Sequence, residues 1–179
     1  MEYLFRDLKA DEIDVRLATV KGNGVSLLLY KDARVDQNIL DETYGAFGWQ
    51  RDHKELKGNI YCGISIFDKE KGQWVTKWDC GKESFSEAEK GEASDSFKRA
   101  GFNWGIGREL YTSPFIWISD EKCNIQEKNG KYYCNDNFIV EAIEIKDKVI
   151  TGLAIRNLNF KNEKGNPIRV FVYKKQEEK

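Results

Sequence analysis

The sequence predicts an α+β fold built on three antiparallel strands followed by a helix. Three strand-like segments follow one another between residues 48 and 81, joined by short polar connections that contain glycine. A helix-like segment then covers residues 86–104, where apolar side chains recur every three or four positions. A hairpin and a further helix precede this β-β-β-α core, and a small β-rich extension follows it, either packed on the core or standing as an appendage.

The first elements are predicted from a turn signal and an apolar pattern. Two partly alternating apolar runs flank the turn "KGNG" and predict a hairpin over residues 14–33. Before it, the apolar side chains of Leu4, Phe5 and Leu8 predict a short amphipathic helix at the N-terminus.

A second helix is predicted over the segment "DARVDQNILDETYG". Asp32 is suited to cap its first turn, and Gly45 is suited to end it. Val35 and Ile39 are four residues apart, so both face the interior.

The three core strands are predicted from their apolar and β-branched residues. They are "GWQRDHKEL", "NIYCGISIFD" and "QWVTKWDCG", and the connections "KGN" and "KEKGQ" are typical of hairpin loops. Antiparallel pairing of neighbouring strands follows from such short connections.

The helix after these strands begins with a capping-box pattern, Ser86 followed by Glu89. Its apolar stripe consists of Ala93, Phe97, Ala100 and Trp104, and Gly105 and Gly107 end it.

Two adjacent cations, Lys98 and Arg99, fall on either side of this stripe at about 100° per residue. Asp95 lies four residues before Arg99, where an ordinary helical ion pair would form. On spacing alone, solvated charges at the margin of a packed face are the simpler interpretation.

The remaining sequence predicts a β-rich extension. Its strand-like segments are "PFIWI", "CNIQ", "KYYC", "FIVEAIEI", "VITGLAIRN" and "IRVFVYK". We therefore divide the chain into a core domain at residues 1–112 and an extension at residues 113–179.

Composition limits the classes of function. With 29 Lys and Arg against 30 Asp and Glu, the chain carries a net charge of −1. Such a balance argues against a protein that coats nucleic acid through bulk charge, although a local basic groove remains compatible with it. We expect a cytoplasmic protein, because no apolar run reaches the length of a membrane span and no signal-peptide pattern opens the sequence.

No catalytic or metal site is predicted. The four cysteines form no CxxC pair, His53 is the single histidine, and the carboxylates near the strands lack the pattern of a two-metal site. "WGIGREL" ends a helix instead of opening one, so a phosphate loop is not expected. We expect a protein that is not an enzyme and binds no cofactor. Cys123 and Cys134 flank a predicted hairpin, which leaves free thiols as the main expectation and a disulfide as the alternative.

Five motifs in order resemble the Rad52/22 family of single-strand annealing proteins, most closely its bacteriophage and bacterial members. They are "YKDAR", "YGAFGWQRD", "GNIYCGISI", "WVTKWDCG" and "EAEKGEASDSFKRAGFNWGIGRELY". The resemblance spans roughly residues 32–111, with weaker similarity in the preceding hairpin. The family's β-β-β-α core agrees with the order of elements predicted above. The resemblance implies ring-type homo-oligomers that bind single-stranded DNA and anneal complementary strands without ATP, in phage homologous recombination and DNA repair.

The resemblance also assigns residues to DNA binding. Positions that match the family's inner DNA groove are Arg34, Lys90, Lys98 and Arg99, and secondary contacts are expected from Lys54, Lys57, Lys77 and Lys82. Their expected role is to bind phosphates, the dominant and salt-sensitive part of nucleic-acid affinity.

Partners and location follow from the same resemblance. An exonuclease and a single-strand-binding protein are expected partners, in the cytoplasm of a bacterial host if a phage encodes the chain. The alternative is an oligomeric phage protein that uses this fold as a protein-interaction module against host factors, with weak or no DNA binding. The near-neutral net charge motivates that alternative.

Overall fold

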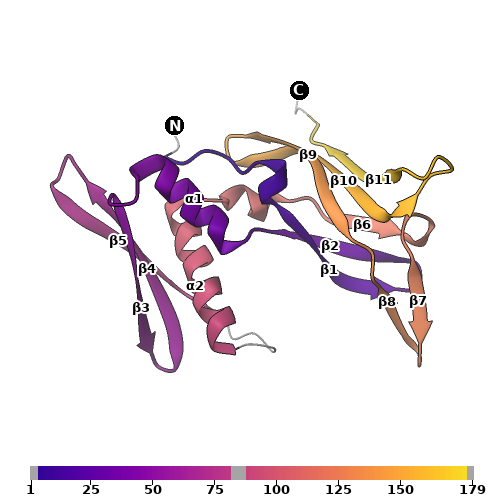
Figure 1. The fold of residues 1–179 in the computed structure, drawn as a ribbon, viewed down its shortest axis with the longest axis horizontal. Helices are drawn as coiled ribbons and strands as arrows, with labels where there is room; N and C mark the ends of the chain where they lie inside the picture. Colours follow the sequence, from indigo (N-terminus) through magenta and orange to yellow (C-terminus); the bar gives the residue numbers. More distant parts are fainter. Residues whose placement is uncertain (1–3, 82–87, 177–179) are drawn as a thin grey trace. The chain divides into compact units, whose positions relative to one another are not determined.

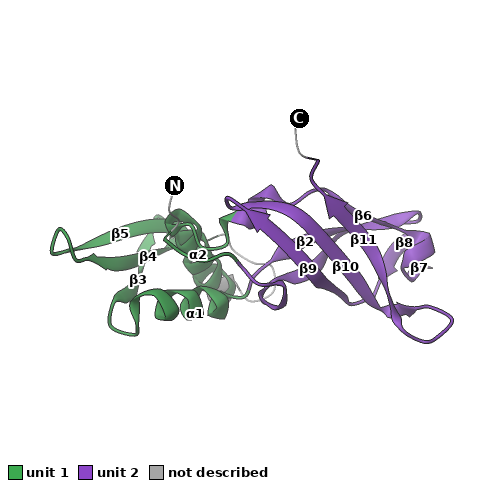
Figure 2. Cartoon of the chain, turned by 90° about the horizontal axis from the view of Figure 1, so that it is seen from above, with its two compact units in different colours: residues 1–7, 32–108 green, residues 8–31, 109–179 purple. Residues whose placement is uncertain are grey.

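A computed structural model describes residues 4–81 and 88–176, and for residues 88–90 it describes the backbone alone. The chain forms two compact units, which are coloured separately in Figure 2. Unit 1 comprises Met1–Asp7 and Asp32–Arg108, and unit 2 comprises Leu8–Lys31 and Glu109–Lys179. The predicted division of the chain at residue 112 stays a prediction. Each of the two units combines two stretches that are separated in the sequence.

Unit 1 contains the predicted β-β-β-α core. Its elements are α1 (Ala33–Tyr44), β3 (Trp49–Leu56), β4 (Asn59–Asp68), β5 (Gln73–Cys80) and α2 (Ala88–Trp104). The strands form an antiparallel sheet in the order β3-β4-β5 (Figure 1). The predicted α+β class is confirmed, and the strand bounds agree with the sequence patterns to within one residue.

The core of unit 1 lies between β4 and the two helices. Cys62, Ile64 and Ile66 alternate along β4 and are buried, which places them on one face of the sheet. Phe97 and Ala100 of α2 are buried as well, and α2 packs against β4 and β5. These two helix residues belong to the stripe that the sequence predicts.

Helix α1 begins and ends as predicted. The Asp32 side chain accepts a hydrogen bond from the Arg34 backbone N–H at 2.8 Å, and Gly45 follows the last residue with a φ of 71°. Ile39 is fully buried. An ideal Cβ on Gly101 of α2 would lie 2.3 Å from Oδ1 of the buried Asp36, so this glycine permits the close approach of α1 to α2.

Unit 2 is a curled antiparallel sheet with an added hairpin. Its elements are η1 (Ala10–Glu12), β1 (Asp14–Lys21), β2 (Gly24–Tyr30), η2 (Arg108–Thr112), β6 (Ile116–Ser119), η3 (Asp120–Lys122), β7 (Ile125–Lys128), β8 (Lys131–Cys134), β9 (Phe138–Lys146), β10 (Val149–Lys161) and β11 (Pro167–Lys174). Six strands pair in the order β11-β10-β9-β1-β2-β6, and β7 pairs with β8 (Figure 1). The two edge strands, β11 and β6, contact each other, so the sheet curls towards a barrel.

The prediction of an N-terminal amphipathic helix is wrong for the described residues. Residues 4–9 are not helical, and only the short η1 turn follows them. The backbone N–H of Leu8 donates to Oε1 of the buried Glu109 at 2.7 Å instead of to a preceding carbonyl. Phe5 and Leu8 are buried, as their apolar pattern indicates, although they do not lie in a helix.

A charged cluster crosses three strands of unit 2. The register of β9 against β10 shifts between Ala154 and Ile155, which leaves Glu141 as the extra residue of a β-bulge. Its carboxylate accepts two hydrogen bonds from Arg169 of β11, at 2.7 and 2.8 Å, and also pairs with Arg156 of β10. The hydrogen bonds from Arg169, and next those from Arg156, lower the pKa of Glu141 to about 2.

We expect Gly101→Ala to destabilise unit 1. Alanine favours a helix over glycine by about 1 kcal/mol, but its Cβ would collide with Asp36, and overpacking of this kind costs about 1–3 kcal/mol. Thermal unfolding of the variant and of the wild type shows whether the substitution lowers or raises the melting temperature. A higher melting temperature for Gly101→Ala would contradict the close approach of α1 to α2.

We also expect the Glu141 cluster to make stability depend on acid. The pKa of Glu141 is lower in the folded chain than its ordinary value of 4.5, so its contribution is complete above about pH 4.5 and is lost as the pH falls towards 2. The melting temperature of the wild type should therefore fall more between pH 6 and pH 3 than that of Glu141→Gln. Glu163→Gln, at an exposed glutamate of the β10–β11 loop, is the matched control and should behave as the wild type. Parallel curves for wild type and Glu141→Gln would refute the assignment.

Candidate functional site

Helix α2 carries the central candidate residues and is attached to β4 at two points. Near its N-terminal end, Oε1 of the buried Glu92 accepts a hydrogen bond from the Ile60 backbone N–H at 2.7 Å. At its C-terminal end, Nε1 of Trp104 donates to the Ile64 carbonyl at 2.9 Å. These two bonds fix the rotation of α2 about its own axis, and so determine which way each of its cations points.

The end of α2 shows why "WGIGR" follows it. Gly105 has a φ of 102° and Gly107 a φ of 68°, which glycine adopts without the strain that other residues meet. Arg108 donates two hydrogen bonds to the Phe102 carbonyl, at 3.1 and 2.8 Å, so a cation lies where the helix dipole is negative. The glycines turn the chain, as predicted.

Lys98 and Arg34 belong to one charged cluster beside Asp32. The Arg34 guanidinium bonds the Asp32 carboxylate, with 2.8 Å between Nε and Oδ1, and 83% of its side-chain surface remains exposed. Hydrogen bonds from the Arg34 side chain and backbone lower the pKa of Asp32, and the charge of Lys98 contributes in the same direction. We call Asp32, Arg34 and Lys98 the α1 cluster.

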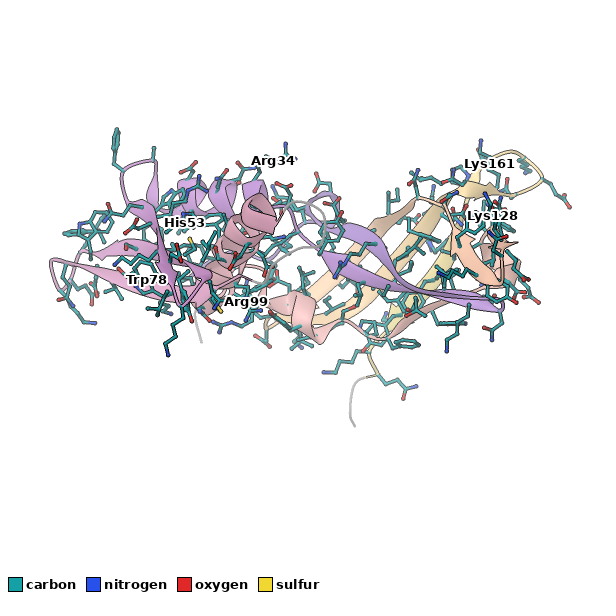
Figure 3. The ribbon with its side chains drawn as sticks, turned by 90° about the horizontal axis from the view of Figure 1, so that it is seen from below. Arg34, His53, Trp78, Arg99, Lys128 and Lys161 are labelled. Atoms are coloured by element: carbon teal, nitrogen blue, oxygen red, sulfur yellow. The ribbon has the colours of Figure 1, made fainter. Side chains whose placement is uncertain are left out.

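Arg99 belongs to a second cluster, on the side of α2 that faces β5. Its Nε lies 3.2 Å from Oδ1 of Asp79, and the amide of Asn103 donates to Oδ2 of Asp79, also at 3.2 Å. About a third of the Arg99 side chain is exposed, so the guanidinium is held by Asp79 and still reaches the surface. We call Asp79, Arg99 and Asn103 the β5 cluster; Figure 3 shows that Arg99 lies apart from Arg34.

The structure therefore separates two residues that are adjacent in sequence. Lys98 lies towards α1 and Arg99 towards β5, on either side of the apolar stripe, as the helical spacing predicts. The ion pair predicted between Asp95 and Arg99 stays a prediction, whereas Asp79, twenty residues earlier in the chain, does contact Arg99.

The secondary candidates Lys77 and Lys54 lie on opposite faces of the β3-β4-β5 sheet. Lys77 donates to the Asn103 carbonyl at 2.9 Å and lies 4.3 Å from the centre of the Trp104 ring, which makes it a second cation at the end of α2. Burial lowers the pKa of Lys77, and the nearby charge of Arg108 adds to this effect. Lys54 lies on the opposite face of the sheet, 4.4 Å from the centre of the Trp78 ring.

Three further candidates complete the set. Lys57 is exposed in the β3–β4 turn with a φ of 55°. Lys82 lies outside the described residues, and so does the side chain of Lys90, whose backbone belongs to α2. The capping-box residues Ser86 and Glu89 lie outside them in the same way.

One exposed cation of this surface was missed by the sequence analysis. Arg51 of β3 lies with its guanidinium 5.2 Å from the centre of the Phe97 ring, on the face of the sheet that α2 covers. A signal was available, because Arg51 is two residues after Trp49, whose ring also packs on Phe97. Alternation along β3 therefore places both side chains on the inner face.

The described residues offer little to other classes of site. Among them, no group of three or more His, Cys, Asp or Glu side chains is placed to hold a metal ion. His53 is exposed on β3, as its charged neighbours indicate (Figure 3). Within the same described part of the chain, no helix is long and apolar enough to cross a membrane.

Comparison with known proteins identifies the chain at the level of family. The family model described as "Rad52/22 family double-strand break repair protein" matches residues 2–130. A comparison with curated proteins found no match. The matched residues include all of unit 1 except Met1, together with residues 8–31 and 109–130 of unit 2. On this match over most of its length, the chain belongs to the Rad52/22 family of double-strand break repair proteins.

Proposed function

We propose that this protein binds single-stranded DNA and anneals complementary strands without ATP, in the homologous recombination and DNA repair of a bacteriophage. Membership of a double-strand break repair family supports the DNA-directed part of this proposal. The five sequence motifs shared with phage and bacterial annealing proteins support the finer part.

The observation that carries the proposal is the placing of exposed or partly exposed cations along both margins of α2. The α1 cluster supplies Arg34 and Lys98, and the β5 cluster supplies Arg99. Arg51 adds a further exposed guanidinium over Phe97. Cations held on a rigid helix and strand suit the phosphates of an extended strand, because phosphate contacts fix the register of the backbone without reading bases.

The two kinds of cation would act differently. Guanidinium groups such as Arg34 bind phosphate oxygens through two parallel N–H donors, whereas the Lys98 ammonium acts as a compact point charge. The carboxylates of Asp32 and Asp79 hold the two arginines in place and compete with phosphate for them. Bases would stay free to pair, since none of these groups is specific for a base edge.

Annealing of this kind needs no chemical step by the protein. We infer that the chain is not an enzyme and works without ATP, because strand pairing is driven by the complementary bases once phosphate repulsion is reduced. The Gly-x-Gly of "WGIGR" ends α2 and does not precede a helix that could cradle phosphates, which supports this part of the proposal.

We further propose that copies of the chain assemble into a ring or arc. Unit 1 has a groove of about 970 Å³ beside β4 and β5, lined by apolar side chains that include Tyr44, Phe47 and Trp74 and by the charged residues 68–71. Phe47 is 96% exposed and Trp74 is 44% exposed, and exposed aromatic surface of this kind is typical of protein interfaces. An exonuclease and a single-strand-binding protein remain proposed partners.

A second function is supported by the charge balance. Arg34 and Arg99 each bond a carboxylate, and the net charge of the chain is −1. An oligomeric phage protein that engages a host protein factor through this fold, with weak or absent DNA binding, would have such compensated charges.

Fluorescence anisotropy with labelled single-stranded oligonucleotides tests DNA binding. We expect affinity to fall steeply with salt, and Lys98→Ala and Arg34→Ala each to weaken binding to every sequence and to reduce the slope of log affinity against log salt by about 0.7. Lys164→Ala, at an exposed lysine of the β10–β11 loop, is the control and should bind as the wild type.

Asp32→Asn should change DNA affinity in the opposite direction in the same assay. Asparagine keeps the N-cap of α1 but removes the negative charge that competes for Arg34, so we expect tighter binding. Unchanged binding in the two alanine variants would refute the site. Absence of binding at low salt by the intact protein would refute the function and favour the protein-interaction alternative.

Light scattering after size exclusion tests the proposed assembly. We expect the wild type to elute as an oligomer and Phe47→Ser with Trp74→Ser to shift it towards the monomer, because apolar contact area is lost. Val172→Ser, which alters a 67%-exposed apolar residue of unit 2, is the control. A wild-type protein that is monomeric at all concentrations with DNA present would rule out the ring.

A further inference from the structure

The β7–β8 hairpin of unit 2 contains two buried thiols that the proposed DNA-binding function does not use. Cys123 precedes β7 and is 3% exposed, and Cys134 ends β8 and is 6% exposed. Both are free in the structure. The family match ends at residue 130, in the turn between these strands, so it does not include Cys134.

The strand register brings the two thiols to the same face of the hairpin. Ile125 pairs directly with Cys134, and Cys123 lies two residues before Ile125 with extended backbone angles, φ −151° and ψ 158°. Cys123 is therefore the diagonal neighbour of Cys134, within reach of a cross-strand contact. Cys134 contributes to the raised pKa of Cys123, and the Cys123 thiol donates to the Ser119 carbonyl at 3.3 Å.

A polar network holds the backbone on both sides of this pair. Asp136 accepts hydrogen bonds from the backbone and side-chain N–H groups of Asn124, each at 2.8 Å. The fully buried Asn157 of β10 donates to Asp136 at 2.7 Å and to the Lys122 carbonyl at 3.1 Å. Asn124, beside Cys123, is thus tied to Asp136, two residues after Cys134, so the two segments that carry the thiols are held together.

The other two cysteines lack such a relation to each other. Cys62 pairs with Asp79 across β4 and β5, and Cys80 pairs with Tyr61. Adjacent positions on a strand point to opposite faces of a sheet, so the Cys62 and Cys80 thiols point apart. Within unit 2, the described thiols are those of Cys123 and Cys134.

We propose that Cys123 and Cys134 are a modification site, at which a low-molecular-weight disulfide such as oxidised glutathione forms a reversible bond that staples the β7–β8 hairpin. One cysteine thiolate attacks a glutathione sulfur, breaks its S–S bond and releases one glutathione thiolate. The second cysteine then attacks the mixed disulfide and releases the other glutathione. Two S–H bonds are lost and one S–S bond forms, and the two released thiolates take up the two protons.

Raised pKa values slow the oxidation of the Cys123 and Cys134 thiols in the folded protein. Burial, with smaller contributions from Cys134, Asp136 and Asp120, raises the pKa of Cys123 to about 12, and burial also raises the pKa of Cys134. The attacking species is the thiolate, so the folded pair reacts slowly and the staple responds to sustained oxidation.

Peptide mapping of the intact protein tests the proposal. After incubation with excess oxidised glutathione, trypsin cleaves after Lys128 and Lys131 and separates the two cysteines onto different peptides. We expect these peptides to be joined, at a mass two hydrogen atoms below their sum, and to separate after reduction. The chain unfolded in denaturant before oxidation is the reference, and should give mixed pairings that include Cys62 and Cys80.

Variants and stability give a second readout. Cys80→Ser should still form the joined peptides, whereas Cys123→Ser and Cys134→Ser should not. The oxidised wild type should melt about 5 °C higher than the reduced protein, because the bond restricts the unfolded chain. Separate peptides from the oxidised native protein, or a bond between other cysteines, would overturn the proposal; the wild-type map decides this even if a serine variant fails to fold.

Discussion

The attachment of α2 to β4 is the constraint on which the candidate site depends. The Glu92 carboxylate holds the start of β4, and the Trp104 indole holds its middle, so the helix can neither slide nor rotate on the sheet. A rotation by one residue, about 100°, would move Lys98 into the position of Arg99 and bury a charge. The close packing of α1 at Gly101 then brings Asp32, with Arg34 bonded to it, near the charge of Lys98. Each cation of the surface takes its place from the packing of apolar and small residues beneath it.

Charge compensation explains how a chain with a net charge of −1 can present cations locally. Asp32 and Asp79 neutralise Arg34 and Arg99 at contact distance, so little positive potential extends far from the surface. In the proposed function, a phosphate backbone at this surface would compete with the two carboxylates for the same guanidinium groups. In that proposal, recognition of phosphate depends on short-range geometry more than on long-range attraction.

The sequence predicted the local elements well because their signals are local. Alternation along β4, the apolar stripe of α2 and the Asp32 cap each depend on residues a few positions apart. Such local signals cannot predict contacts between residues that are far apart in the sequence. Asp79 as the partner of Arg99, Glu109 as the acceptor for Leu8, and β9 as the neighbour of β1 each join segments that no periodicity relates. Arg51 was missed for a different reason, since a charged residue in a strand is ordinarily assigned to solvent.

In unit 2, strands within the family match pair with strands that lie beyond it. Strands β1 and β2 lie within the matched residues, but β1 pairs with β9, which lies beyond them. Val25 of β2 is fully buried within unit 2, and so are Ile150 and Ile155 of β10. A chain that ended at residue 130 would lose β8 to β11, so the apolar face of the first hairpin would be uncovered and β1 would become an open edge. The C-terminal strands β9, β10 and β11 therefore belong to the same sheet as β1, which begins at residue 14.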